Sequence, residues 1–251
     1  MSTPYLSIIT VTFNAEQTLP LTLQSVASQT YRGFVEHVIV DGASKDNTVQ
    51  IAARYKEEHP EIGVTIISEP DEGLYDAMNK GLKVARGTFV CFMNAGDAFH
   101  DTQTLEVVLE NSIHADGIGV VYGDTIIVDE MGHFLRKRHL NAPEHLRWTS
   151  FKKGMLVCHQ SFYARRTLCP LYDTHYRYSA DVDWCIKVMK AGHEQGLTNQ
   201  NTHAVLTDFL DGGMTHKNHR ASLVERFRIM VKHYGIMSTL WNHFLFLFRS
   251  H

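Results

Sequence analysis

The sequence predicts an α/β fold, in which helices flank a mostly parallel, Rossmann-like sheet and a helical extension follows at the C-terminus. Four runs, 6–13, 36–40, 64–68 and 88–93, are nearly continuous in apolar and β-branched residues, as strands buried on both faces tend to be. Segments with apolar residues at spacings of three and four separate these runs, which is typical of helices. Such regular alternation predicts parallel strands joined by right-handed crossovers.

The three intervening segments carry signals for helix ends. Asn14 can cap the first helix, and Asp46 or Asn47 can start the second. The third begins near Gly73 and ends near Gly87, where a glycine suits the C-cap.

The second half of the chain has a mixed pattern. Its expected elements are a helix at 102–112, a hairpin at 119–138 that turns at 129–132, a helical segment at 143–148, a strand at 155–166, a helix at 181–193 and a helical pair at 219–249. We therefore divide the chain into a domain of residues 1–215, with halves 1–100 and 101–215, and a C-terminal helical extension of residues 216–251.

Composition excludes several functional classes. The 24 basic and 27 acidic residues give a formal charge of -3, so the chain lacks the basic field that nucleic-acid binding requires. No apolar run reaches the length of a membrane span, and the N-terminus does not resemble a signal peptide. The four cysteines show no C-x-x-C spacing, which favours a reducing cytoplasm.

Four short loops follow the predicted strands of the first half. They are 12–14, 41–44, 69–72 and 94–97, and three of them contain carboxylates. In parallel α/β sheets, ligands bind beyond the carboxyl ends of the strands. A purely structural sheet has no reason to collect acidic side chains at one edge, so these loops predict a ligand site.

Four motifs carry a family resemblance. They are "LSIITVTFNAEQTLPLTLQSVASQ" (6–29), "VIVDGASKDNT" (38–48), "SEPDEGLYDAMNKGLKVARGTFVCFMNAGD" (68–97) and "YSADVDWCIKVMKAGH" (178–193). In this order, over residues 5–215, the chain resembles family 2 inverting glycosyltransferases of the bacterial exopolysaccharide or colanic-acid type. The resemblance implies the GT-A fold and transfer of a sugar from a nucleoside diphosphate sugar. It makes 1–100 the nucleotide-sugar-binding half and 101–215 the acceptor-binding half.

The resemblance assigns the first loops to the nucleotide. Asp41 would accept the uracil N3–H, which suits an ionised carboxylate because it has only acceptors. Thr12, Phe13 and Asn14 would contact the base and ribose. Helix capping is an alternative role for Asn14, and Phe13 could equally be a core residue.

Asp71, Lys80 and Asn94 complete the expected nucleotide site. Asp71 matches a nucleotide contact of the family, and Asn94 would be a neutral contact to the sugar or ribose. For Lys80, a simple i,i+4 ion pair with Asp76 is a rival interpretation.

The loop "NAGD" (94–97) takes the place of the family's D-x-D element, whose acids hold Mg²⁺ or Mn²⁺ against the diphosphate. Asn94 and Gly96 stand where acids are commoner, so Asp97 would be the metal ligand. His216, which ends the Gly-Gly segment "DGGMTH" (211–216), would reach the diphosphate or the metal when that loop closes over the donor.

Asp181 matches the family's catalytic base, with Ala180 in place of the usual Glu. A carboxylate there can take the proton of the acceptor hydroxyl as it attacks the anomeric carbon. Capping of the following helix is the alternative role for Asp181, and Asp183 would then be the fallback base. His159 and Gln160 are expected near the acceptor or the transferred sugar.

Together these features predict a metal-dependent glycosyltransferase with a UDP-sugar preferred over a GDP-sugar. The expected acceptor is a glycan, polyprenyl-linked, in bacterial cell-surface polysaccharide synthesis at the inner face of the plasma membrane. A nucleotidyltransferase and a non-catalytic sugar-nucleotide-binding protein are the alternatives. The extension 216–251 can pack on the domain, form a homodimer, or contact the membrane surface as an amphipathic helix.

Overall fold

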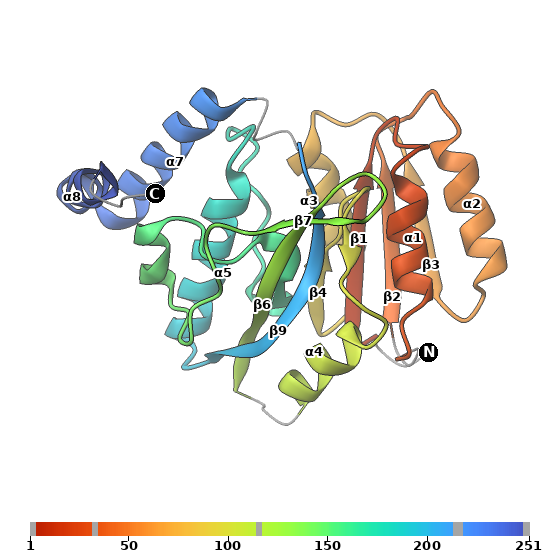
Figure 1. Ribbon diagram of the computed structural model, residues 1–251, viewed down its shortest axis with the longest axis horizontal. Helices are drawn as coiled ribbons and strands as arrows, with labels where there is room; N and C mark the ends of the chain where they lie inside the picture. Colours follow the sequence, from red (N-terminus) through yellow and green to blue (C-terminus); the bar gives the residue numbers. More distant parts are fainter. Residues whose placement is uncertain (1–3, 32–34, 114–116, 213–217, 248–251) are drawn as a thin grey trace.

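The computed structural model describes residues 4–31, 35–113, 117–212 and 218–247. Within these ranges the chain forms one nine-stranded sheet with helices on both faces (Figure 1). The strands are β1 Leu6–Thr12, β2 Val35–Asp41, β3 Gly63–Ser68, β4 Phe89–Phe92, β5 Ala98–Phe99, β6 Ile118–Val128, β7 Phe134–Lys137, β8 Phe162–Arg165 and β9 Thr198–Leu210. The α-helices are α1 Leu19–Ala27, α2 Thr48–Glu58, α3 Leu74–Val84, α4 Thr104–Ile113, α5 Ala180–Glu194, α7 His219–Tyr234 and α8 Ile236–Leu247. Short 3-10 helices occupy Trp148–Lys153, His159–Ser161 and Arg166–Leu168.

The first half of the sheet is parallel. β3, β2, β1 and β4 lie side by side in that order, and each neighbouring pair is parallel. The register pairs Thr12 with Asp41 and Asp41 with Ser68, so β1, β2 and β3 end at the same level. We call the rim formed by the ends of β1–β4 the carboxyl edge; it carries the four predicted loops.

The second half of the sheet is mixed. β8 runs antiparallel to both β4 and β6, β9 runs parallel to β6, and β5 is antiparallel to β9. β7 pairs with β6 as the predicted hairpin. The α/β fold class is confirmed, but β5 and β9 were not predicted. β9 begins with the polar run "TNQNTH" and is only partly buried, so it lacks the apolar run that marks the other strands.

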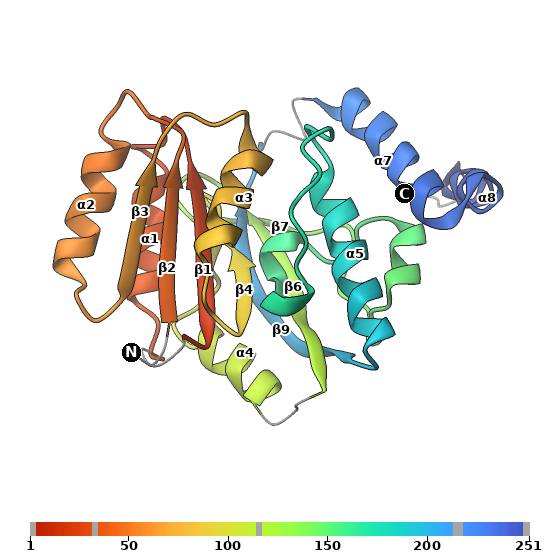
Figure 2. The same cartoon turned by 180° about the vertical axis from the view of Figure 1, so that it is seen from behind.

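Apolar side chains on both faces of the sheet form the core. On one face, α3 and α5 cover the sheet (Figure 2), and the rings of Phe92 and Trp184 meet edge to face at 5.6 Å between centroids. On the other face, Ile8 packs with Leu105 of α4, and α1 and α2 pack over Ile39. The helices therefore hold both ends of each parallel strand in place, including the carboxyl edge.

Two of the predicted helix ends are wrong. α1 begins at Leu19 with Thr18 at the N-cap, whereas Asn14, two residues beyond the end of β1, adopts a left-handed conformation (φ 48°). α3 ends at Val84, and Gly87 is not its C-cap. A Cβ at Gly87 would lie 2.6 Å from the backbone nitrogen of Ser7, so this glycine is needed for close chain approach. The predicted start of α2 is confirmed, with Asn47 at its N-cap.

The segment 143–166 also differs from the prediction. Only Phe162–Arg165 of the expected strand 155–166 is extended, because the 3-10 turn at His159–Ser161 precedes it. The helical turn expected at 143–148 lies instead at Trp148–Lys153.

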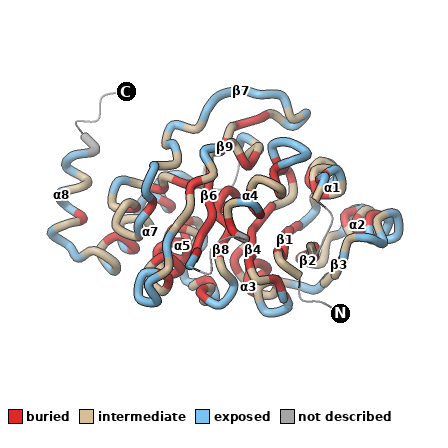
Figure 3. The backbone as a smooth tube through the Cα atoms, turned by 90° about the horizontal axis from the view of Figure 1, so that it is seen from below, coloured by how far each residue is buried: buried red, intermediate tan, exposed pale blue. Residues whose placement is uncertain are grey.

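The C-terminal helical pair is confirmed as α7 and α8. Both views place α7 beside α5 and α8 at the outer end of the molecule, farthest from α2 (Figures 1 and 2). Burial is concentrated in the central strands, whereas α8 has a mostly exposed or half-buried backbone (Figure 3). Across the described ranges, no helix combines the length and apolar character needed to cross a bilayer.

Candidate active site

Asp41 lies at the centre of the nucleotide side of the carboxyl edge. It is fully buried at the end of β2. Its Oδ2 accepts hydrogen bonds from Ser44 N (3.0 Å) and Ser68 Oγ (2.7 Å), and its Oδ1 accepts one from Ser44 Oγ. A carboxylate has about four acceptor positions, so these donors fix its orientation and leave one position for a ligand N–H.

The β1–α1 and β2–α2 loops are joined to each other by hydrogen bonds. Asn14 N donates to Ser44 Oγ at 2.8 Å, and Lys45 N donates to Asn14 Oδ1 at 2.9 Å. Because its side-chain oxygen is engaged by Lys45, Asn14 does not cap α1, and Thr18 takes the N-cap position. They make a rigid wall beside Asp41.

Phe13 and Asp71 converge on Gly42. A Cβ at Gly42 would lie 3.2 Å from Phe13 Cδ2 and closer still to Asp71 Oδ2, so only glycine admits both side chains. Phe13 is 63% exposed, so the core alternative is wrong and its ring faces solvent next to Asp41. An exposed aromatic side chain next to carboxylate acceptors is suited to stack on a nucleobase.

Asp71 and Lys80 have different surroundings. Asp71 Oδ1 accepts from Gly73 N at 2.8 Å, which shapes the turn into α3. Lys80 Nζ donates to Pro70 O at 2.6 Å and lies 3.0 Å from Glu69 Oε1 and 3.6 Å from Asp76 Oδ2. The ion pair with Asp76 is therefore present. Lys80 also holds the β3–α3 loop through Pro70 and Glu69.

Asp97 anchors the second part of the site. It is 4% exposed, and its carboxylate accepts hydrogen bonds from Gln160 Nε2 at 2.7 Å and from Leu210 N at 3.1 Å. Burial raises the pKa of Asp97 to about 6, although these hydrogen bonds and the nearby His159 oppose the shift. Thr22 of α1 holds the same loop, because its Oγ1 donates to Asp97 O at 2.7 Å and accepts from Gly96 N.

Gly96 has a conformational reason to replace an acid. Its φ is 104°, in the region that favours glycine, and a Cβ there would lie 2.6 Å from Leu210 Cδ2. The tight packing of β9 against this loop therefore excludes a side chain at 96.

The described residues do not form a cation site before a donor binds. In the described ranges, no three His, Cys, Asp or Glu side chains are grouped so that they could hold a metal ion. Asp97 offers one carboxylate, and both of its oxygens already accept N–H donors. His216 lies outside the described residues. We derive no catalytic step through a metal.

Asp181 lies in the first turn of α5, whose N-cap is Ser179. Its Oδ1 accepts a hydrogen bond from Tyr75 OH at 3.2 Å, and its Oδ2 lies 3.6 Å from His159 Nδ1. Burial raises the pKa of Asp181, but the neighbouring His159 and Arg226 outweigh that effect and hold the pKa below its ordinary value. Asp181 is therefore a carboxylate at neutral pH, as a general base must be.

Asp183 does not replace Asp181. It points toward α7, where its oxygens lie 2.6 Å from Lys187 Nζ, 3.2 Å from Lys232 Nζ and 2.7 Å from His233 Nε2. Burial raises the pKa of Asp183, but the hydrogen bonds from His233, Lys187 and Lys232 and the charge of Lys187 outweigh burial and hold the pKa far below its usual range. The fallback interpretation of Asp183 as a base is wrong, because two ammonium groups and an imidazole already occupy its carboxylate.

Unpartnered polar atoms gather at the predicted site. Thr12 Oγ1, Asn94 Oδ1 and His159 Nε2 are buried and have no hydrogen-bond partner among the described residues. Such atoms are costly unless a ligand or water satisfies them. The backbone joins the two parts of the site here, because Ala95 N donates to Val11 O at 3.3 Å.

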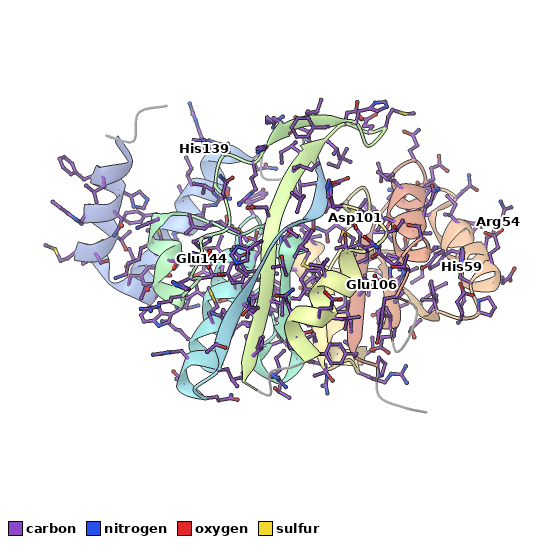
Figure 4. The ribbon with its side chains drawn as sticks, turned by 60° about the horizontal axis from the view of Figure 1, so that its bottom comes forward. Arg54, His59, Asp101, Glu106, His139 and Glu144 are labelled. Atoms are coloured by element: carbon purple, nitrogen blue, oxygen red, sulfur yellow. The ribbon has the colours of Figure 1, made fainter. Side chains whose placement is uncertain are left out.

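The cavities of the structure divide clearly. One of about 280 Å³ is lined by residues that include Tyr75, Arg177 and Tyr178. Tyr75 connects it to Asp181 through the hydrogen bond from its OH group. A larger one of about 550 Å³ lies between α1 and α2, where Arg54 and His59 project from the outer part of α2 (Figure 4). That groove is lined by no residue of the four carboxyl-edge loops, whereas the smaller cavity includes Glu72 of the loop 69–72. The smaller cavity is therefore the one that we associate with the site.

The sequence between residues 7 and 169 matches the model of glycosyl transferase family 2. The chain belongs to this family. A PGL/p-HBAD biosynthesis glycosyltransferase of Mycobacterium bovis (strain BCG / Pasteur 1173P2) is 33% identical over 227 residues, which are 85% of this chain and 79% of the relative. An uncharacterized glycosyltransferase of Mycobacterium tuberculosis, Rv1514c, is 37% identical over 110 residues, covering 43% of this chain and 40% of the relative.

Solved structures confirm the GT-A-like fold of this family 2 glycosyltransferase. S. aureus TarS 1-349 superposes with a TM-score of 0.68 at 17% identity, covering 96% of this chain and 72% of TarS. The mannosyltransferase PcManGT from Pyrobaculum calidifontis, in complex with GDP-Man and Mn2+, gives 0.67 at 19% identity, covering 92% and 65%. The family match and the 33% identical relative make the chain a glycosyltransferase, which disfavours the nucleotidyltransferase and non-catalytic alternatives.

Several site residues escaped the sequence analysis. Ser44 and Ser68 orient Asp41, Thr22 holds the 94–97 loop, and Tyr75 binds Asp181. Tyr75 lies inside the motif "DEGLYDAMNKG", to which the sequence analysis gave importance without assigning a role to this residue. Gln160 was expected near the acceptor or the transferred sugar, and that role stays a prediction. Its buried amide donates to Asp97 and accepts from Cys158 Sγ at 2.7 Å.

Proposed function

We propose that this glycosyltransferase transfers its sugar with inversion and that Asp181 is the general base. The acceptor hydroxyl attacks the anomeric carbon from the face opposite the diphosphate. A new C–O bond forms as the bond to the phosphate oxygen breaks, the nucleoside diphosphate leaves with the bonding electrons, and Asp181 takes the hydroxyl proton. The observation that carries this proposal is the ionised Asp181, held by Tyr75 and faced by His159, with Tyr75 also lining the cavity of about 280 Å³.

For the donor, we propose a UDP-sugar in preference to a GDP-sugar. Asp41 would accept the base N–H, Phe13 would stack on the base, and Thr12, Asn14 and Asp71 would surround the ribose. The solved neighbours include TarS with UDP-GlcNAc and PcManGT with GDP-Man, so both nucleotides belong in the test. Lys80 would support this site through the β3–α3 loop, and Asn94 would meet the sugar or ribose.

The metal role of Asp97 and His216 stays a prediction. A divalent ion would be held mainly by the donor's phosphate oxygens, with Asp97 as its one described carboxylate, and it would offset the charge of the leaving diphosphate. PcManGT was solved with Mn2+, which supports testing Mn²⁺ first.

The acceptor that we propose is a polyprenyl-linked glycan in bacterial cell-surface polysaccharide synthesis, at the inner face of the plasma membrane. The motif resemblance supports this acceptor class. His159, whose buried Nε2 has no described partner, would then meet the acceptor or the transferred sugar.

A donor screen by thermal unfolding tests the proposal. A ligand at about 100 times its Kd stabilises the native state by about 2.7 kcal/mol, which raises Tm by roughly 5–10 °C for a chain of this size. UDP and UDP-sugars should raise Tm more than GDP or ADP. Phe13→Ala should remove most of this shift, whereas Phe134→Ala, a control at a phenylalanine of similar exposure on β7, should retain it. Equal shifts in both variants would exclude base stacking on Phe13.

A further inference from the structure

α8 exposes an apolar stripe. Six of its large apolar side chains are substantially exposed: Ile236, Met237, Leu240, Trp241, Phe244 and Leu245. They recur at intervals of four residues in two adjacent rows, which places them along one side of the helix. Met237 is 77% exposed and Trp241 is 62% exposed. Single exposed apolar residues are ordinary, but a contiguous stripe marks an interaction surface.

Charge distinguishes this end of the molecule from the rest. Residues 216–251 contain six Lys or Arg and one acidic residue, a formal charge of +5. Residues 1–215 contain 18 basic and 26 acidic residues, a formal charge of -8. α8 contains no Lys, Arg, Asp or Glu, and α7, the helix that leads into it, exposes Arg220 and Arg228. The apolar stripe therefore adjoins the basic part of an otherwise acidic protein.

The position of the two helices links this surface to the site. α7 starts near the carboxyl edge and runs outward to α8, which stands at the end of the molecule (Figures 1 and 2). α7 also holds the segment before α5, because Glu225 accepts hydrogen bonds from Arg177 N at 2.8 Å and Tyr178 N at 2.9 Å. Arg177 and Tyr178 line the same cavity as Tyr75, the residue that hydrogen-bonds Asp181.

We propose that α8 lies in the headgroup region of an anionic bilayer, with Trp241 and its apolar neighbours entering the interface and the basic residues of α7 attracted to lipid phosphates. Interfacial helices combine such a stripe with nearby Lys and Arg. α8 has 12 residues and so is about 18 Å long, too short to span the roughly 30 Å of hydrocarbon. The helix lies on the membrane and does not cross it.

A second copy of the chain fits this surface less well. A two-fold dimer places the same patch on both subunits, so two segments of charge +5 would face each other. Like charges brought together in this way oppose association. An anionic lipid surface has the opposite charge and meets the apolar stripe with apolar chains.

Vesicle co-sedimentation of the full chain tests the proposal. The probes are vesicles of phosphatidylcholine alone and vesicles containing about one third phosphatidylglycerol, at low and at physiological salt, without sugar nucleotide. We expect binding to the anionic vesicles that falls as salt screens the charges. Each exposed basic residue near the surface contributes about a fivefold gain in binding, so Arg220→Gln with Arg228→Gln should reduce binding by about 25-fold.

Two double variants distinguish binding through α8 from non-specific adsorption of exposed apolar side chains. Met237→Ser with Trp241→Ser should reduce vesicle binding at least tenfold while keeping the Tm shift that a donor nucleotide produces. Met131→Ser with Phe134→Ser is the matched control, because these hairpin residues are 76% and 58% exposed and should leave binding unchanged. The proposal does not depend on donor chemistry, so a failed donor screen leaves it standing.

Three results would overturn the proposal. The first is equal binding of the two double variants, and the second is equal binding to neutral and anionic vesicles. The third is a dimer in light scattering that becomes a monomer in the Met237→Ser with Trp241→Ser variant and shows no vesicle binding. That last result would assign the stripe to a second copy.

Discussion

Gln160 Nε2 donates a hydrogen bond to Asp97 Oδ2 at 2.7 Å, and this contact ties the loop 94–97 to the 3-10 turn at His159–Ser161. The preceding residue, His159, lies beside Asp181. One 3-10 turn thus fixes both the predicted metal ligand and the proposed base. A substitution of either acid can therefore affect the other through this turn.

Asp97 gives a pH-dependent prediction. Its pKa is raised from 3.8 to about 6, so the native state favours the protonated form; that stability is complete below pH 4 and lost as the pH rises through 6. A shift of this size corresponds to about 3 kcal/mol. Asp97→Asn cannot ionise, so the difference in unfolding free energy between wild type and variant should change by about that amount between pH 4 and 7. Urea unfolding across this range measures it, and parallel pH profiles would contradict the buried, ionisable Asp97. The hydrogen bond lost in the variant adds only an offset that does not vary with pH.

The metal prediction concerns donor binding. If Asp97 contributes to a cation bound with the diphosphate, Mn²⁺ should tighten UDP binding by about tenfold relative to EDTA, which is about 1.4 kcal/mol. Asp97→Asn should remove most of this gain. Calorimetric titration of UDP with Mn²⁺ and with EDTA measures both effects, and equal affinity of the wild type under the two conditions would exclude the metal role.

Gly42 is predicted to set the geometry of the donor site. In Gly42→Ala the new methyl group would displace the side chains of Asp71 and Phe13, which a Cβ at this position would crowd. We expect about tenfold weaker UDP binding. Gly63→Ala on β3 is the control, since a Cβ there meets its neighbours at 3.7 Å or more. Unchanged UDP affinity in Gly42→Ala would show that Asp71 and Phe13 do not bind the nucleotide in this arrangement.

Asp183 is predicted to stabilise the packing of α5, the helix that carries Asp181, against α7. Removing one partner of a buried ion-pair cluster costs about 3–5 kcal/mol, so Asp183→Asn should be strongly destabilised at pH 7. Its pKa is held low, so the stability it gives is present above its ordinary pKa and is lost as the pH falls through the lowered value. The cost in Asp183→Asn should therefore shrink at acid pH in urea unfolding. If this variant does not fold, Lys232→Gln removes one cation and should show the same trend with a smaller cost. A cost that stays constant with pH would contradict the ionised cluster.

Much of the fold was open to prediction because its elements follow from local patterns. The buried parallel strands are continuous apolar runs, and α3, α5 and the C-terminal pair show helical spacing. β9 could not be found in this way, because a half-exposed strand with Asn and Gln has neither an apolar run nor a clear alternation. The misplaced cap at Asn14 has a tertiary cause, since the left-handed residue is held by the neighbouring loop.

In the candidate site too, features set by the local sequence could be predicted and features set by tertiary contacts could not. The acids at the strand ends could be predicted as site residues, because a purely structural sheet has no reason to gather carboxylates at one edge. The hydrogen bond from Gln160 to Asp97 could not be predicted, because the two residues are 63 positions apart in the sequence. Tyr75 was missed because its partner Asp181 is 106 residues away, and only folding brings α3 and α5 together.

The most direct test of Asp181 as the base compares sugar transfer with donor binding in Asp181→Asn. General-base catalysis contributes about 10²–10⁴-fold, so kcat for transfer to acceptor should fall by that factor while the Kd for UDP stays within about twofold of wild type. Glu194→Gln, an exposed acid at the other end of α5, is the control and should keep full activity. Tyr75→Phe should lower kcat by about tenfold, because a charge-assisted hydrogen bond is lost. Transfer by Asp181→Asn at the wild-type rate, with UDP bound normally, would contradict its role as the base.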